Sequence, residues 1–182
     1  MNLYRVIPYD PSAAPTQRGG ALFVPPGSRR NRIDNPDLYD ALYLAAAPEA
    51  AIAESFGRSP IWTAETFIHG TGRPYSLLTY DVPDDIPIFD LDDIDALRSI
   101  GIMRPSAIVT RDRAKTQAWA RSILENGRYV GASWWSYYSP DWIVMGLWNR
   151  SAVTTTTVPE ILSPNSNAVR EAARTIVRQI DP

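Results

Sequence analysis

A glutamate in an alanine-rich segment is the first residue of this sequence that could do chemistry. Glu54 follows Ala47, Ala50, Ala51 and Ala53, and on a helix Ala51 and Ala47 share its side, at three and seven residues back. A carboxylate on such a face of small side chains is either a partly buried group with a function or an ordinary surface glutamate. Composition does not separate the two, and position alone slightly favours the surface.

Arginine is the second source of candidates. Lys115 is the only lysine, and all other basic residues are arginine. A GC-rich genome would produce this bias by itself, which is the simpler explanation. The planar fork of arginine also suits phosphates and carboxylates, so one or two could be recruited to an anionic ligand. The formal net charge of -2 provides no broad basic field for a phosphate backbone, so we expect no direct nucleic acid binding.

The aromatic segment 133–138, Ser-Trp-Trp-Ser-Tyr-Tyr, permits three interpretations. Aromatic residues on a strand are most often core, and alternation would place Trp134 and Ser136 on one face and Trp135 on the other. The rings could instead form a stacking platform for sugars, as in a carbohydrate-binding module. One face could also line a pocket for a nucleotide or nicotinamide ring. Periodicity alone favours the core for any single ring.

The sequence lacks the residues that several classes of site require. It has no cysteine, which excludes disulfides, a thiol nucleophile and thiolate metal ligands. The single histidine, His69, lies in a glycine-rich turn and is interpreted as a surface-loop residue, so we expect no metal site. Neither the Rossmann glycine motif nor the P-loop is present. The aspartates between positions 84 and 95 do not match a calcium loop and are better explained as a solvated loop and helix cap.

Length and hydropathy predict a single soluble domain, or one domain with an added tail, because 182 residues can enclose a sizeable core. The N-terminal residues 1–5 lack the apolar region of a signal peptide, and no apolar run approaches the ~20 residues that span a bilayer. We therefore expect a cytoplasmic protein that does not enter the membrane.

Strands and helices are predicted without regular alternation, which favours an α+β fold over a doubly wound sheet. Strands are predicted at 3–7, 42–46, 75–82, 86–91, 129–135 and 142–148. Helices are predicted from Pro48 to a stop at Gly57, after a cap at Asp92 or Asp93, between 111 and 126, and after a cap at Asn165 or Ser166. Residues 11–37, rich in Pro, Gly, Ser and Arg, are expected to be irregular.

Several blocks of the sequence together form a pattern. The most specific block is Leu-Tyr-Leu-Ala at 42–45 followed by Pro-Glu-Ala-Ala-Ile-Ala-Glu at 48–54, and the others lie at 3–6, 32–36, 89–91, 116–120 and 131–136. In this order they resemble the RES domain family, which is named for a characteristic Arg, Glu and Ser and includes toxins of bacterial toxin–antitoxin systems. Block 3–6 is similar to the opening Tyr-Arg-Val strand of the family, 32–36 to its Arg-Phe-Asn/Asp segment, and 131–136 to its Gly-x-x-Tyr-x-Ser strand. The resemblance covers roughly residues 3 to 150. Trp134 departs from it, because the family more often has Tyr there.

The resemblance implies a fold like that of ADP-ribosyltransferases, with a mixed β core, flanking helices and a cleft that holds NAD. It also implies cleavage of NAD by hydrolysis or phosphorolysis, with Arg32, Tyr43, Glu54 and Ser136 as catalytic residues. Arg32 would clamp the pyrophosphate, Tyr43 would pack on the nicotinamide or its ribose and make a polar contact, and Glu54 would stabilise the oxocarbenium character that develops at the ribose. Ser136 would hydrogen-bond the ribose or the carboxamide.

Two further residues are assigned to substrate binding, namely Arg5, as the anchor of an attacking phosphate, and Trp134. Arg29, Arg30 or Arg5 could share the phosphate contact with Arg32 or take it over. NAD is expected as a substrate rather than a cofactor, with inorganic phosphate as a possible co-substrate and no metal.

The resemblance further implies a partner, a helix-turn-helix antitoxin of the Xre type, and leaves open a homo-oligomer. Residues 1–155 are expected to form the RES-like NAD-binding catalytic domain, and 156–182 a C-terminal helical tail packed on it. The acceptor is left open among water, phosphate and a protein, so protein ADP-ribosylation is one alternative. An alternative of another class is a non-catalytic aromatic-rich binding module, which predicts exposed, coplanar tryptophans.

Overall fold

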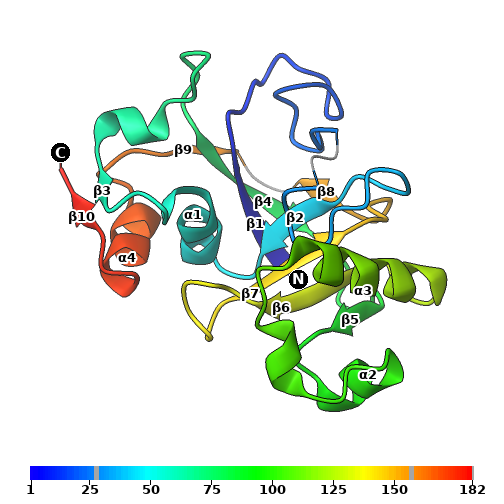
Figure 1. Ribbon diagram of the computed structural model, residues 1–182. Coiled ribbons are helices and arrows are strands. Elements are labelled where there is room, and N and C mark those ends of the chain that lie inside the picture. The colour runs from blue at the N-terminus through cyan, green and yellow to red at the C-terminus, as the bar shows by residue number, and fades with distance from the viewer. Residues whose placement is uncertain (27–28, 156–157, 182) are drawn as a thin grey trace.

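A mixed sheet of eight strands forms the centre of the computed structural model, which describes residues 1–26, 29–155 and 158–181 (Figure 1). The strand order is β5-β6-β7-β2-β1-β4-β8, and β9 also pairs with β4. Among the described strands of this sheet, only β5 and β6 pair in parallel, and the other pairs are antiparallel. The strands are β1 (Asn2–Ile7), β2 (Leu42–Ala45), β4 (Ser76–Asp81), β5 (Ile88–Asp90), β6 (Gly131–Trp135), β7 (Ile143–Leu147), β8 (Thr154–Thr155) and β9 (Glu160–Ile161).

The alternation of side chains along β1 divides the core between the two faces of the sheet. Leu3 and Ile7 belong to one apolar cluster, together with Ala21 from the irregular N-terminal segment. Tyr4 and Val6 point the other way and pack against the larger cluster, which contains the buried residues of the helices. The two-residue period of a strand accounts for this division.

The helices begin and end near the predicted positions. They are α1 (Pro48–Phe56), α2 (Ile94–Ser99), α3 (Arg113–Glu125) and α4 (Asn167–Thr175). The carboxylate of Asp93 caps α2 by accepting from the backbone N–H groups of Asp95 and Ala96. Ser166 is the N-cap residue of α4, but its hydroxyl makes no cap bond to that helix.

Gly57 follows α1, as predicted, for a reason of packing. Its φ of -62° is that of an ordinary helical residue. A Cβ at this position would lie 2.5 Å from the Tyr138 ring and 2.5 Å from the Ala53 carbonyl oxygen. Only glycine therefore lets the turn after β6 approach the end of α1, and this approach brings two distant segments of the chain together.

The C-terminal residues return to the middle of the chain. Helix α4 packs against α1 (Figure 1), and β10 (Gln179–Ile180) pairs in parallel with β3 (Ile61–Trp62). The Arg178 guanidinium donates from Nε and Nη2 to the carbonyl of Gly57, at 2.9 and 2.7 Å. The far end of the chain thus supports the segment that follows α1.

The structure confirms the predicted α+β fold with a mixed sheet and flanking helices. Its short elements were not predicted: β3, β8, β9, β10 and the 3-10 turns η1 (Ala64–Phe67) and η2 (Pro105–Ile108). The described part of 11–37 contains no helix or strand beyond one isolated bridge, between Asn35 and Tyr39. Within the described residues, no helix has the length and apolar character needed to cross a membrane.

Candidate active site

A cavity of about 880 Å³ lies on the sheet face that α1 covers. Its wall contains residues of β1, β2, β6 and β7, the C-terminal half of α1, and the loops around residues 31, 110 and 137. The predicted site residues Arg32, Tyr43, Glu54 and Trp134 all belong to the wall. Residues far apart in the sequence therefore meet around one hollow.

Glu54 and Ser136 form a direct hydrogen-bonded pair at this cavity. The Ser136 hydroxyl donates to Glu54 Oε1 at 2.6 Å, and its oxygen accepts the backbone N–H of Tyr138 at 3.1 Å. Ser136 is 2% exposed and is not part of the cavity wall, whereas Glu54 is exposed to the cavity. Ser136 thus holds the Glu54 carboxylate from its buried side, and the carboxylate places a negative charge at the cavity.

Arg32 projects into the cavity from the loop between β1 and β2. Its Nη1 donates to the carbonyl of Ile108 at 3.0 Å, and its guanidinium carbon lies 5.7 Å from the centroid of the Trp134 ring. Burial is the main cause that lowers the pKa of Arg32, and the charge of Arg113 lowers it further. A guanidinium stays protonated in proteins, so a positive charge stands in a partly desolvated wall.

The Tyr43 hydroxyl is occupied by the protein itself. It donates to Asp34 Oδ1 at 2.6 Å and accepts the backbone N–H of Ile33 at 3.3 Å. Burial, followed by the bond to Asp34, raises the pKa of Tyr43 well above its ordinary value. The tyrosine ring meets Trp134 edge-on, with centroids 6.3 Å apart. The hydroxyl of Tyr43 therefore makes its polar contacts to the loop that carries Arg32, and Tyr43 contributes to the cavity wall.

Trp134 is both a core residue and a wall of the cavity. It is 8% exposed and packs in the same cluster as Val144, and Trp135 is half-buried. Trp134 therefore belongs to the core and also lines the cavity, and its contact with a nicotinamide ring stays a prediction. Every tryptophan lies within the described residues and none is exposed. The structure therefore does not provide the exposed, coplanar tryptophans that a sugar-stacking platform needs.

Arg5, the expected phosphate anchor, already has a hydrogen-bond partner within the protein. Arg5 contributes to the cavity wall, but its Nη1 donates to the carbonyl of Phe23 at 2.8 Å. On β1 it shares a face with Leu3 and Ile7, whose side chains pack on the opposite side of the sheet. Its guanidinium consequently supports the N-terminal irregular segment. Arg29 forms an ion pair with Asp37 at 2.9 Å and is not part of the wall.

The cavity is also lined by arginines that the sequence patterns did not single out. Arg58, Arg111 and Arg113 line it together with Arg30 and Arg32, and among the described residues of the wall Glu54 is the only acidic one. Arg111 also donates from Nη2 to the Tyr137 hydroxyl at 2.8 Å across the rim. The cavity is therefore cationic although the whole chain carries a formal charge of -2. Among the described residues, no cluster of His, Cys, Asp or Glu could hold a metal ion.

Comparison with known proteins shows the family of the chain and a protein of similar fold. The model of the RES domain matches residues 2–165. The chain belongs to the RES domain family. No curated protein matched the sequence. A chain in the crystal structure of the M. tuberculosis MbcT–MbcA toxin–antitoxin complex is similar in fold, with a TM-score of 0.60 and 18% identity over 97% of this chain and 88% of that one. The sheet and its helices are consistent with the ADP-ribosyltransferase-like fold that the resemblance implied.

Proposed function

We propose that this RES domain protein cleaves the bond between nicotinamide and ribose in NAD. The observation that carries the proposal is the Glu54–Ser136 pair, a carboxylate held at 2.6 Å by a buried hydroxyl and open to a cationic cavity. Family membership supports it, and we assign the Arg, Glu and Ser that name the family to Arg32, Glu54 and Ser136 of this chain from the resemblance of their segments.

The chemistry needs negative charge rather than a metal or a strong acid. When the bond from the ribose C1 to the pyridinium nitrogen breaks, the electron pair leaves with nicotinamide, which departs neutral. The ribose then acquires oxocarbenium character, which a fixed carboxylate such as Glu54 stabilises. An oxygen of water or of inorganic phosphate bonds to C1. Water gives ADP-ribose and a proton, and phosphate gives a phosphorylated ADP-ribose.

The remaining wall suits the other parts of NAD. The pyrophosphate carries two negative charges, and a planar guanidinium such as that of Arg32 can bind phosphate oxygens with two parallel N–H groups. The rings of Trp134 and Tyr43 offer apolar surface beside this cation. The volume of about 880 Å³ lies in the range of pockets that enclose small ligands and cofactors.

In this proposal the protein is the toxin of a toxin–antitoxin pair and acts on NAD in the cytoplasm. The family and the similarity to a chain from a toxin–antitoxin complex support this assignment. A helix-turn-helix antitoxin of the Xre type would be the partner that holds it inactive.

The test is to incubate purified protein with NAD, with and without phosphate, and to measure nicotinamide by chromatography. We expect release by the wild type and a decrease of about 10²–10³-fold for Glu54→Ala, the typical cost of removing one preorganised charge contact. Glu49→Ala is the matched control, because Glu49 lies on the same helix but outside this cavity. Equal nicotinamide from wild type and Glu54→Ala would refute the proposal. Labelled NAD that leaves its mass on a polypeptide would instead indicate protein ADP-ribosylation.

A further inference from the structure

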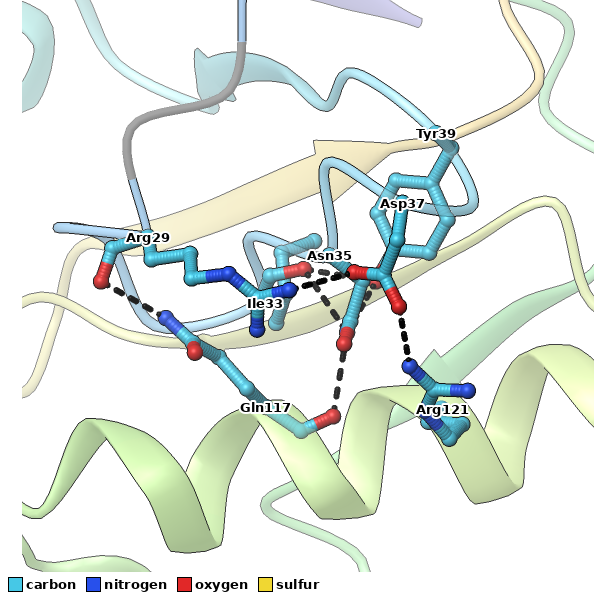
Figure 2. A network of polar contacts seen from close by, with 7 residues as sticks. All are labelled: Arg29, Ile33, Asn35, Asp37, Tyr39, Gln117 and Arg121. Atoms are coloured by element: carbon cyan, nitrogen blue, oxygen red, sulfur yellow. Dashed lines mark hydrogen bonds and ion pairs between the residues drawn. The ribbon is translucent and has the colours of Figure 1, made fainter.

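The backbone immediately before Arg32 is held by side chains of α3, more than eighty residues away. Gln117 Nε2 donates to the carbonyls of Arg29 and Asn31, at 2.9 and 3.0 Å, and Arg113 Nε donates to the carbonyl of Arg30 at 3.1 Å. Three consecutive carbonyls are thus bound by two residues that lie one turn apart on the helix. Figure 2 shows Gln117 reaching from α3 towards Arg29.

The backbone conformation of this loop gives an independent reason for such bonds. Arg29 has a φ of 55°, in the left-handed region that residues other than glycine adopt at a cost of about 1 kcal/mol or more. A conformation of this kind persists when surrounding contacts determine it. The bond from Gln117 to the Arg29 carbonyl is one such contact, and it is made by a side chain that is only 8% exposed.

Further polar contacts fix the other half of the loop to the same helix (Figure 2). Asn35 Nδ2 donates to the backbone carbonyl of Gln117 at 3.0 Å, and the Tyr39 hydroxyl donates to the carbonyl of Ile33 at 2.6 Å. Arg121 Nη2 pairs with Asp37 at 2.6 Å on the surface. The loop is therefore anchored on both sides of Arg32, and the anchor nearest to it on the N-terminal side is Gln117.

We propose that Gln117 is a positioning residue for Arg32, setting where its guanidinium meets the phosphates of the dinucleotide. This inference rests on the proposed function for its substrate, and on the contacts above for its geometry. Gln117 is not part of the cavity wall, so it acts through the loop rather than on NAD. Arg113 shares the anchoring, but it lines the cavity and its charge acts on Arg32, so its substitution would mix two effects.

The central test is a double-mutant cycle between Gln117→Met, which keeps the length of the side chain and removes its N–H donors, and Arg32→Ala. We expect Gln117→Met alone to lower kcat/KM for NAD about 10–100-fold, the scale of a small misplacement of a binding group. The change should appear mainly in KM, because phosphate binding is common to the ground and transition states. In the Arg32→Ala background the same substitution should change kcat/KM less than threefold. An equal loss in both backgrounds would overturn the inference.

Arg121→Met is the matched control on the next turn of α3, because it breaks the surface pair with Asp37 and leaves the three carbonyls bound. We expect it to leave KM within about twofold of wild type, since exposed ion pairs contribute little. An increase of KM as large as that of Gln117→Met would show that any loosening of the loop has the same effect, and would also overturn a specific role for Gln117.

A spectroscopic measurement separates this inference from the proposed function. The Nε–H signal of Arg32 in a ¹⁵N correlation spectrum, assigned by its loss in Arg32→Lys, should shift in Gln117→Met and stay in place in Arg121→Met. An unshifted signal refutes the positioning role whatever the enzyme does. A shifted signal in a protein that releases no nicotinamide retains the positioning role and refutes the NAD activity.

A second variant covers the case in which Gln117→Met does not fold. Gln117→Glu has the same shape and can donate one O–H hydrogen bond, but only while its carboxyl is protonated. Burial next to two carbonyls raises the pKa of such a carboxyl. We expect KM relative to wild type to be near one at pH 5 and at least fivefold higher at pH 8. A constant ratio across this range contradicts the inference.

Discussion

Ser136→Ala removes one oxygen atom and tests whether the buried hydroxyl maintains the charge that the proposed reaction needs. In the wild type this hydroxyl donates to Glu54 Oε1 at 2.6 Å and accepts the N–H of Tyr138 at 3.1 Å. A hydrogen bond to a charged group contributes about 1.5–3 kcal/mol. If this free energy is realised in the transition state, kcat falls by about 10–150-fold, at about 1.4 kcal/mol for each factor of ten.

The same substitution has a separate cost in stability. The N–H of Tyr138 loses its acceptor in a site where Ser136 is 2% exposed, so we expect the free energy of unfolding to fall by about 1–3 kcal/mol. Nicotinamide release gives kcat, and urea unfolding gives the stability of the same preparation. Ser139→Ala is the control, because its hydroxyl accepts only from Asp141 in the same turn, at 3.3 Å, among the described residues.

Two results would refute this reasoning. The first is a folded Ser136→Ala protein with the kcat of the wild type. The second is a kcat ratio for Ser136→Ala that is equally large in a Glu54→Gln background, because the serine is argued to act through that carboxylate. Substitutions of two residues that act as a unit change kcat by much less together than the product of their separate effects.

Three other substitutions test the surroundings of the site. Tyr43→Phe removes one of the donors to the buried Asp34, the hydroxyl at 2.6 Å, so urea unfolding should show a loss of about 1–3 kcal/mol, and equal stability would contradict the arrangement. Burial and the neighbouring Asp90 raise the pKa of Asp92 from 3.8 to about 6. Between these two pH values the folded state holds a proton that the unfolded state releases, so stability is lost as the pH rises from about 3.8 to about 6. Asp92→Asn should therefore raise Tm at pH 7.5, by a modest amount because the residue is exposed, and leave Tm unchanged at pH 3.5. Arg178→Met removes two donors to the Gly57 carbonyl, and hydrogen exchange of β10 should become faster while that of β7 stays the same.

The regular elements at the site follow from patterns that the sequence displays directly. Pro48 in the first turn and the apolar run that follows predict α1, and the aromatic-rich run at 129–135 predicts β6. These elements carry Glu54 and precede Ser136, so the pair depends on regular elements that the sequence indicates. Position alone slightly favoured an ordinary surface glutamate, and Glu54 is indeed exposed, but its carboxylate is held by a buried serine.

The loop 29–39 and the arginines of the rim could not be predicted in the same way. A segment without a period gives no direction to its side chains, so nothing in the sequence indicated that Asp34 would be buried or that Gln117 would reach two carbonyls. Arg58, Arg111 and Arg113 are three arginines among many in this sequence, and only the folded chain brings them to one cavity. For Arg5, the structure adds a bond from its Nη1 to the carbonyl of Phe23 that no pattern indicated, and its contact with a phosphate stays a prediction.

The two charges proposed to act on NAD are held by different kinds of structure, and this difference has a measurable consequence. Glu54 lies on helix α1 and is bonded to Ser136 just after strand β6, so its carboxylate has little freedom to move. In the proposed reaction this carboxylate stands where positive charge develops. Arg32 is fixed by a loop whose conformation depends on bonds from α3, so its position can vary without disruption of the sheet. Substitutions of residues that hold Glu54, such as Ser136, should therefore change kcat. Substitutions on the side of α3 that contacts the loop should change KM. A set of α3 variants that lowered kcat while KM stayed constant would place Arg32 at the reacting bond instead of the phosphates.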